Sequence, residues 1–380
     1  MTITGRRYYN GTYYYITYTV SITEIPNGAY YLKNKHTGYY ADIEGPTMAS
    51  GTTIHQWEYH GASSQRWIFK HLGDGYYSIK SSRSSSAYYM GVINDSSDLD
   101  VDIVLRTGTI SDGMKWRIES TSNNAYKIIP KTGVSSGYVL ATTTSSAANG
   151  YKLIQGNYLN NNSYRDEWLL EPYSVVLYGI TNEDHDHISC LNTISSTMLN
   201  STWNDVIVRG GAIASSTCRN DLLSSNVFTS RSHGQWVRYA GTQDVAATGI
   251  ILDDKSTDYV AFYSHSWSSM SSGSTYIQTN DDYTGLNVVL FIGCETAKGG
   301  KNARNLPTTI VEHGAFASIG FSESIGCGSA NTWTTNFYNK MLQGATLQEA
   351  VDYACSLASE SSGLKSAVIC GDSSIRFPTN

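Results

Sequence analysis

Charged residues are scarce in this chain: Asp, Glu, Lys and Arg make up 15% of its 380 residues, against about 25% in an average globular protein. The formal net charge is −6 and the Lys and Arg residues form no basic stripe, which argues against nucleic acid as a partner. No apolar run approaches the roughly 18 residues of a membrane-spanning helix, so no membrane span is expected. The N-terminal segment also lacks the apolar core of a signal peptide. Either the protein is cytoplasmic or its signal sequence has been removed. The 29 tyrosines and the low charge favour removal, and with it a secreted or cell-surface location.

Cysteine is absent from the first half of the chain. All six cysteines lie after residue 189, at positions 190, 218, 294, 327, 355 and 370, so disulfides cannot form a scaffold for the whole chain. None has the CxxC spacing of a zinc site, and we expect neither a metal nor another cofactor. Cys294 has surroundings that indicate chemistry. For the other five we expect buried, small apolar side chains, with one disulfide pair as the alternative.

Three repeats fill the first half. Segments starting at Ala29, Gly75 and Ala125 each open with tyrosine and alternate apolar with polar residues, a pattern typical of a β-strand. Each repeat closes on a tryptophan: Trp67, Trp116 and Trp168. Three β-rich units are too few for a propeller, which needs at least four blades. A barrel with threefold pseudo-symmetry is therefore predicted.

The repeats resemble the ricin-B-type β-trefoil lectins over about residues 27 to 172. The resemblance implies an all-β trefoil whose closing tryptophans pack in the barrel core, and a glycan as ligand. We expect an N-terminal extension over residues 1–26, a trefoil lectin domain over 27–173 and a further domain over 174–380, joined near Glu171–Pro172.

In this family a sugar site takes an Asp early in the repeat, an aromatic platform and a polar group just before the closing tryptophan. The first repeat has Asp42, Trp57 and Gln65 at these places, with Ser64 where the family often has Asn. A carboxylate can accept hydrogen bonds from two sugar hydroxyls, and an aromatic ring can cover the apolar face of a pyranose. The alternative is a trefoil kept as a rigid spacer, with Asp42 serving a turn.

The other two repeats lack this combination. The second has Gly91 in place of the Asp and Leu105 or Arg106 near the platform position. The third has Ala141, with Gln155 or Gly156 near the platform position. Glycan binding is therefore expected at the first repeat.

The pattern changes at Ser174. Continuous apolar runs at 174–180 and 205–213 predict strands buried on both faces, while residues 184–199 have apolar positions at helical spacing. Pro307 is expected in the first turn of a later helix. Alternating strands and helices predict an α/β three-layer sandwich around a largely parallel sheet. Ligands of such sheets collect at the carboxyl ends of the strands.

Two predicted strands end in reactive residues: NVFTSRSHG at His233–Gly234 and LNVVLFIGCET at Cys294–Glu295. If the strands are neighbours, both residues reach the same rim of the sheet. There a thiolate can act as nucleophile and an imidazole can protonate a leaving amine. Glycine at 234 permits close approach of the backbone, so that the N–H groups of Gly234 and Cys294 can hold an oxyanion.

These motifs resemble the caspase-like cysteine peptidases of clan CD over about residues 175 to 372. The caspase signature QAC(R/Q/G)G is absent, because FIGCETAKGG stands there; the order of FIGCETAKGG, EHGAFASIGF and FYNKMLQGATLQEAVDYA is similar to CHAT-domain and gingipain-like members. The resemblance implies a caspase-like fold and a cysteine endopeptidase with the dyad His233 and Cys294, acting on a protein or peptide substrate.

Other histidines have simpler explanations. His265 is the rival base, but Ser follows it rather than Gly. His313 precedes a glycine at an expected helix C-terminus, where a histidine suits the helix dipole. His185 and His187 flank Asp186 in a predicted solvated loop, without enough further ligands for a metal.

Acidic residues near the rim favour cleavage after Arg or Lys. In clan members with this preference an acidic side chain near the S1 pocket is common, and a carboxylate there forms charge-assisted hydrogen bonds with a guanidinium. The candidates are Glu183, Asp184, Asp186 and Glu323. The alternative for the first three is the start of a helix with Asp184 as N-cap.

Two functions remain open. One is a cysteine endopeptidase targeted by a carbohydrate-binding trefoil. The other is a lectin whose caspase-like domain is catalytically inert. A serine hydrolase is disfavoured because the α/β half of the sequence shows no GxSxG elbow.

Overall fold

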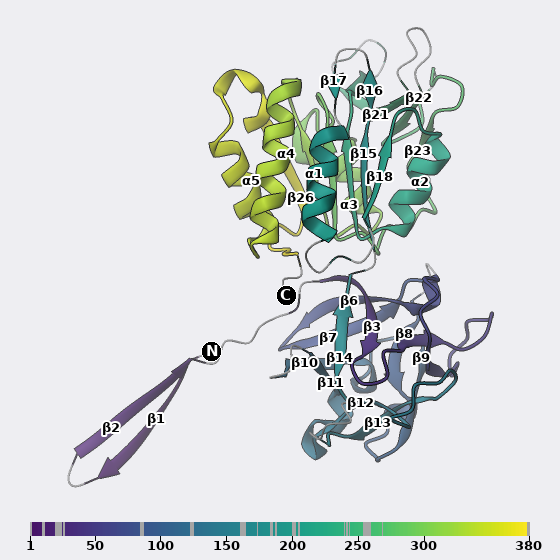
Figure 1. The fold of residues 1–380 in the computed structure, drawn as a ribbon, viewed down its shortest axis with the longest axis vertical. Helices are drawn as coiled ribbons and strands as arrows, with labels where there is room; N and C mark the ends of the chain where they lie inside the picture. Colours follow the sequence, from purple (N-terminus) through teal and green to yellow (C-terminus); the bar gives the residue numbers. More distant parts are fainter. Residues whose placement is uncertain are drawn as a thin grey trace.

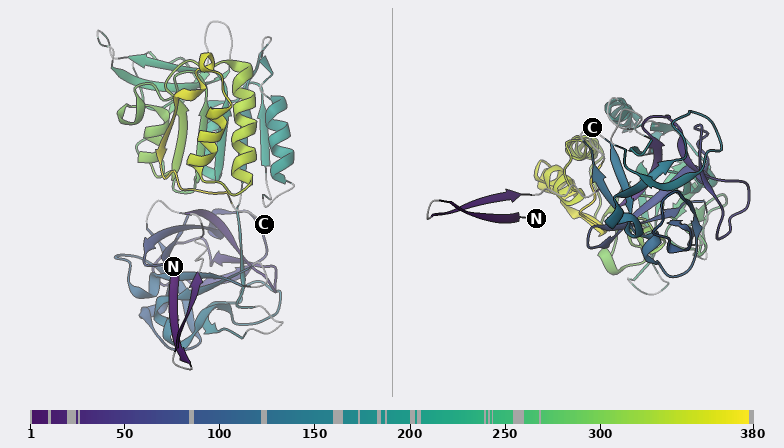
Figure 2. Two further views of the ribbon diagram at one scale, coloured as in Figure 1. Left: turned by 90° about the vertical axis from the view of Figure 1, so that its left-hand side faces the viewer. Right: turned by 90° about the horizontal axis from the view of Figure 1, so that it is seen from below.

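The computed structural model describes residues 2–9, 12–19, 25, 27–83, 87–121, 125–159, 165–172, 174–182, 185–186, 188–199, 203, 206–238, 240, 242, 244–253, 260–267 and 269–377. Within these ranges, no helix is both long and apolar enough to cross a membrane. Strands β1 (Thr2–Tyr9) and β2 (Thr12–Thr19) form an antiparallel hairpin, which projects away from the two domains that follow (Figures 1 and 2).

The first domain is an all-β trefoil, as the three repeats predict. Each repeat supplies four strands. The strands are β3 (Gly28–Asn34), β4 (Tyr40–Ile43), β5 (Ile54–Trp57), β6 (Arg66–Gly73), β7 (Tyr76–Ser81), β8 (Tyr89–Val92), β9 (Val101–Arg106), β10 (Trp116–Ser120), β11 (Tyr126–Pro130), β12 (Tyr138–Thr142), β13 (Leu153–Asn157) and β14 (Trp168–Glu171). All of them belong to one hydrogen-bonded sheet.

The three closing tryptophans define the threefold pseudo-symmetry. Trp67, Trp116 and Trp168 are fully buried in one apolar core, where such large side chains contribute most to burial. Each donates its indole N–H to a backbone carbonyl in the preceding hairpin: Ala41 at 3.0 Å, Met90 at 3.0 Å and Leu140 at 2.9 Å. This shared bond fixes which residues are equivalent in the three repeats.

The second domain is built on a six-stranded sheet in the order β18-β15-β19-β24-β25-β26. Its strands are β15 (Val175–Gly179), β18 (Val206–Gly210), β19 (Val227–Arg231), β24 (Val288–Ile292), β25 (Ala317–Phe321) and β26 (Ala367–Gly371). The first five in the order run parallel, and β26 is antiparallel to β25. The largely parallel α/β sheet predicted from the sequence is therefore confirmed.

Helices cover both faces of this sheet (Figures 1 and 2). Helices α1 (Ile188–Leu199), α4 (Cys327–Leu342) and α5 (Leu347–Ser356) pack on one face, in a core with Leu177 and Leu290. Helices α2 (Ser215–Ser224) and α3 (Leu306–Glu312) pack on the other, with Val176 and Val289. Successive strand residues thus face opposite layers. Pro307 lies in the first turn of α3, as expected.

A second, four-stranded sheet extends from the region after His233. It contains β20 (Gly234–Arg238), β21 (Val245–Asp253), β22 (Val260–Tyr263) and β23 (Thr275–Tyr276). A small hairpin of β16 (Thr181–Asn182) and β17 (His185–Asp186) precedes α1. The expected helix over 184–199 is therefore wrong at its start: residues 185–186 pair as a strand, and the helix begins at Ile188.

The cysteines differ in burial. Cys218 and Cys370 are buried, whereas Cys190, Cys294, Cys327 and Cys355 are partly exposed, and none of the six forms a disulfide. The prediction of buried side chains thus holds for two of the five other cysteines. Burial raises the pKa of the Cys218, Cys355 and Cys370 thiols, which makes these three poor nucleophiles.

Candidate functional site

The predicted sugar-binding residues of the first repeat lie on one hairpin. Asp42 pairs with His55 across β4 and β5, and Tyr40 pairs with Trp57. Because paired and alternate residues share a face of a sheet, these four side chains lie on the same face. Trp57 is partly exposed and stacks on His55, with ring centroids 5.1 Å apart. The hairpin therefore presents an aromatic surface beside a carboxylate.

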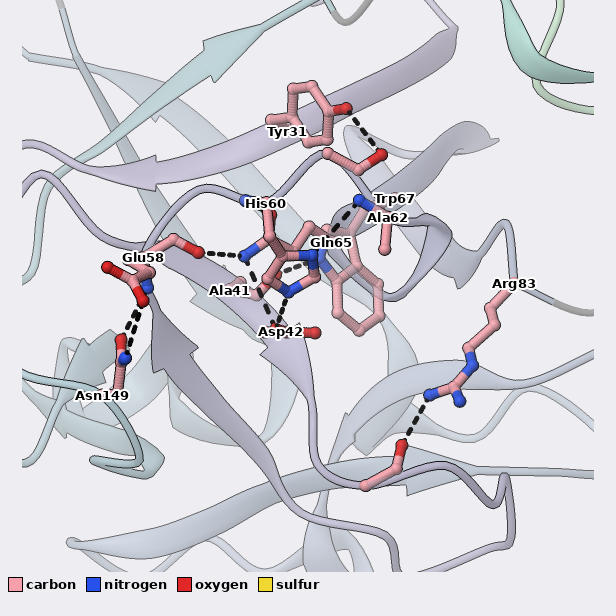
Figure 3. A network of polar contacts seen from close by, with 12 residues as sticks. Tyr31, Ala41, Asp42, Glu58, His60, Ala62, Gln65, Trp67, Arg83 and Asn149 are labelled. Atoms are coloured by element: carbon pink, nitrogen blue, oxygen red, sulfur yellow. Dashed lines mark hydrogen bonds and ion pairs between the residues drawn. The ribbon is translucent and has the colours of Figure 1, made fainter.

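Asp42 is almost completely buried, with 4% of its surface exposed. Its Oδ2 atom lies 2.7 Å from Nε2 of His60 (Figure 3). The Nδ1 atom of His60 accepts a hydrogen bond from the N–H of Ala62 at 3.3 Å, which assigns the proton of the neutral ring to Nε2. The Oδ1 atom of Asp42 has no hydrogen-bond partner in the described residues. A buried carboxylate oxygen of this kind is costly unless a ligand or water supplies a donor.

The side chain of Gln65 holds Asp42 and the loop of His60 in place. It is fully buried, and its Nε2 donates to the carbonyl of Glu58 at 2.8 Å and to Asp42 at 3.5 Å. Its Oε1 accepts from the N–H of His60 at 3.1 Å. Because both atoms of the Gln65 amide are already hydrogen-bonded within the protein, the structure assigns Gln65 to holding Asp42 and the loop of His60 rather than to the sugar contact expected from the sequence. The sequence gives no signal for His60, which precedes Gln65 by five positions.

The indole bonds make the other repeats directly comparable. The residue that follows the accepting carbonyl is Asp42 in the first repeat, Gly91 in the second and Ala141 in the third. By strand register, the residue equivalent to Trp57 is Arg106 in the second repeat and Gly156 in the third. Arg106 forms an ion pair with Asp95, and hydrogen bonding to Arg106 lowers the pKa of Asp95 to about 2. The second repeat thus has an internal ion pair where the first has Trp57, and the third has no carboxylate or ring at these places.

In the second domain, the structure brings His233 and Cys294 to one rim. Strands β19 and β24 are parallel neighbours, with Arg231 beside Ile292. His233 and Cys294 each come two positions after the end of their strand. The N–H of Ser232 donates to the carbonyl of Ile292 at 3.2 Å, so the pairing continues past the strands. A Cβ atom on Gly293 would lie 2.9 Å from the nitrogen of Gly234, and one on Gly234 would lie 2.9 Å from the nitrogen of Cys294. The two glycines therefore allow the backbones of 232–234 and 293–294 to touch.

The turn after Cys294 is held from several sides. Glu295 has a left-handed backbone, with φ of 55°, a conformation that is costly for a non-glycine residue. Its N–H donates to the carbonyl of Glu323 at 3.0 Å, and the hydroxyl of Thr296 donates to the carbonyl of Phe291 at 2.8 Å. The Sγ of Cys294 lies 3.4 Å from the N–H of Ile325. The thiol is thus fixed between the ends of β24 and β25.

One S1 candidate lies beside this turn. The side chain of Glu323 is exposed, and its backbone is bonded to Glu295. Glu183 and Asp184 lie outside the described residues, and for Asp186 the structure describes the backbone alone. The alternative of a helix start does not hold for Asp186, which belongs to β17.

His265 lies in a different environment from His233. It follows β22, with Nδ1 3.2 Å from the hydroxyl of Ser264, and that hydroxyl donates to the carbonyl of Arg304. Burial, with the nearby charges of Arg304 and His313, lowers the pKa of His265 to about 4. His313 is the C-cap of α3, as expected. Within the described residues, no group of three His, Cys, Asp or Glu side chains is arranged to hold a metal.

The pKa of His265 predicts a pH effect on stability. Because the folded pKa lies below the usual value of 6.5, the unfolded chain binds more protons between pH 6.5 and 4, and stability falls as the pH falls through this window. The variant His265→Gln cannot titrate and should lose less stability there. The urea unfolding midpoints of both proteins, measured between pH 7 and 4, test this difference in stability. Midpoints that fall equally with pH in both proteins would refute the lowered pKa of His265.

Comparisons with known proteins identify the class of the first domain. Residues 17–106 match the family described as "Ricin-type beta-trefoil lectin domain-like". Together with the three indole bonds, this match defines a ricin-B-type β-trefoil lectin domain, a carbohydrate-binding class of domain, in the first half of the chain.

Individual relatives share parts of the chain. Flavastacin of Elizabethkingia meningoseptica is 29% identical over 113 residues, which cover 30% of this chain and 25% of flavastacin, so the match spans about a quarter of that protein. The designed threefold symmetric protein ThreeFoil is 26% identical over 38% of this chain and 98% of its own, with a TM-score of 0.35. The Rhizoctonia solani agglutinin is 23% identical over 40% of this chain and 98% of its own, with a TM-score of 0.33.

Proposed function

We propose that this protein is a cysteine endopeptidase whose substrates are bound in part through glycans. The observation that carries the proposal is the meeting of His233 and Cys294 at neighbouring ends of β19 and β24, with their flanking backbones in contact. The carboxyl ends of parallel strands are where α/β proteins hold their active sites. Peptide-library cleavage by the wild type and by Cys294→Ala tests it.

The order of elements around the dyad supports a caspase-like domain. The β20–β21 hairpin follows His233, and the CHAT-domain peptidases that this half of the chain resembles also have a hairpin after their His–Gly. After Cys294 come α3, β25 and α4 in the implied sequence of helix, strand and helix. The sharp turn at Glu295 exposes the thiol at a strand end, which suits a nucleophile better than a packing residue.

The proposed reaction uses only groups of this rim. The thiolate of Cys294 attacks the peptide carbonyl, and the N–H groups of Gly234 and Cys294 donate hydrogen bonds to the developing oxyanion. As the C–N bond breaks, the imidazolium of His233 gives its proton to the leaving amine. Water then hydrolyses the thioester with His233 as base, which releases the acid and restores the thiol.

We propose that the trefoil binds its glycan at the first repeat, over Trp57 and Oδ1 of Asp42. The unpartnered Oδ1 supplies the acceptor for a sugar hydroxyl, and the exposed part of Trp57 supplies the apolar platform. His60 and Gln65 hold the carboxylate in place through Oδ2. A secreted or cell-surface location fits a glycan ligand, and immunodetection in culture medium and on intact cells would test that location.

We also propose cleavage after Arg or Lys, with Glu323 as the candidate carboxylate, because its backbone carbonyl accepts a hydrogen bond from Glu295 in the turn after Cys294. Glu323→Lys should lower kcat/KM for Arg-containing peptides by about 10-fold or more, because it replaces an attractive charge with a repulsive one. Asp352→Lys makes the same charge change on an exposed part of α5 and is the matched control. A library profile dominated by Asp, Asn or apolar residues before the cleaved bond would contradict this preference.

A further inference from the structure

The trefoil is bound to the α/β domain through the backbone of one residue of β3, Ala29. The N–H of Ala29 donates to Oδ1 of Asn287 at 3.0 Å, and its carbonyl accepts from Nδ2 of Asn226 at 2.5 Å. All three residues are buried. Both backbone groups of Ala29 are therefore satisfied by the second domain, so that separating the domains would leave them without partners.

The two asparagines are themselves held by the α/β backbone. Oδ1 of Asn226 accepts from the N–H of Ser174 at 3.0 Å, and the N–H of Asn287 donates to the carbonyl of Asn226 at 2.6 Å. Gly28 completes the fit, because a Cβ atom there would lie 2.6 Å from Cγ of Asn287. Its φ of 154° also disfavours other residues. This contact between Ala29, Asn226 and Asn287, called the joint below, therefore leaves little room for movement between the domains.

Further contacts surround this joint. Lys80 forms an ion pair with Asp282 at 3.5 Å, and Arg66 donates to the carbonyl of Ser224 at 3.4 Å. Phe316 of the α/β domain packs against an apolar cluster that includes Tyr31 and Tyr40 of the trefoil. Figures 1 and 2 show the trefoil against one end of the α/β domain.

The joint has a defined relation to both proposed sites. Asn226 and Asn287 directly precede β19 and β24, the strands whose opposite ends lead to His233 and Cys294. At about 3.3 Å per residue, the path from residue 226 to residue 233 is roughly 23 Å long. Asp42 follows Tyr40 by two residues on β4, about 7 Å beyond the interface cluster. The two strand paths add up to roughly 30 Å, which we take as the order of the separation between the sugar site and the catalytic rim.

We propose that the two domains act as one rigid unit that selects glycoproteins in which the glycan and the cleaved bond lie on the same chain, at least about nine extended residues apart. This inference rests on the proposed function. Binding of the glycan makes the encounter with the rim intramolecular, which raises the effective concentration only for segments long enough to span the gap. Bonds closer to the glycan cannot reach the rim while the sugar stays bound.

The test maps cleavage positions in unfolded serum glycoproteins by mass spectrometry, with an enzymatically deglycosylated aliquot as reference. For the wild type, we expect cleavage beyond about nine residues from a glycosylated residue to be at least about 10-fold faster than in the reference. Closer sites should gain nothing. Cleavage positions that ignore glycans, with unglycosylated peptides still cut, would overturn this inference alone; no cleavage of any substrate would also remove the proposed function.

The double variant Asn226→Ala/Asn287→Ala tests the joint itself. It should cut unglycosylated peptides at the wild-type rate, yet lose the distance limit because the domains become independent. Its thermal unfolding should separate into two transitions. Lys80→Gln, which removes a contact at the edge of the joint, is the milder variant if the double variant does not fold. A distance limit that persists in a variant with two transitions would contradict the rigid joint.

Discussion

Cys294→Ala is expected to lower peptide cleavage by about 10⁴-fold or more, because it removes the nucleophile on which covalent catalysis depends. The fold should remain, since the thiol is partly exposed and its contacts are to the backbone of Ile325. Cys190→Ala, at another partly exposed cysteine, should retain activity and serves as the control. Full activity in Cys294→Ala would end the peptidase proposal.

His233→Ala should produce a loss of about 10²- to 10⁴-fold, the usual range for a general acid or base. The matched variant at the rival histidine, His265→Ala, should keep most of the activity, because that ring lies beside Ser264 and Arg304 rather than on the rim. Initial rates on one fluorogenic peptide measure both. The reverse order of effects would move the base to His265.

Asp42→Asn and Trp57→Ala should each weaken glycan binding by about 5- to 150-fold, which corresponds to the roughly 1 to 3 kcal/mol of a charged hydrogen bond or an aromatic contact. Asp42→Asn keeps the volume but weakens the acceptor at Oδ1. Trp57→Ala removes the exposed platform. Retention on a glycan array measures the effect.

Arg106→Ala is the matched control for this site. Arg106 takes the place of Trp57 in the second repeat, where it pairs with Asp95. Its loss should leave glycan retention unchanged. If Arg106→Ala weakens retention while the first-repeat variants do not, the binding site belongs to the second repeat.

The trefoil could be predicted from the sequence because its signals are local and repeated. The closing tryptophans mark each repeat, and their indole bonds to Ala41, Met90 and Leu140 repeat the same geometry. The role of Gln65 could not be predicted. Its side-chain amide forms hydrogen bonds with Glu58, His60 and Asp42, and these depend on a loop conformation that residue spacing does not reveal. His60 was missed for the same reason.

In the second domain, apolar runs predicted the strands. The position of His233 and Cys294 at the ends of two of these strands made them the candidate catalytic residues. The start of α1 was predicted too early, because the polar segment at 184–187 has the composition of a helix N-terminus while residues 185–186 pair with β16. The joint between the domains had no signal at all. Asn226 and Asn287 are ordinary residues before strands until the fold brings Ala29 between them.

The most direct measurement is labelling of the native protein with a mixed-sequence peptidyl chloromethyl ketone, followed by mass-spectrometric mapping of the adduct. If the rim is a peptidase site, the label is found on Cys294, and labelling slows strongly in His233→Ala. Burial raises the pKa of the Cys218, Cys355 and Cys370 thiols, which slows their alkylation, so Cys190 and Cys327 are the internal references. Equal labelling of those two and Cys294, with no dependence on His233, would contradict the assignment of a catalytic dyad.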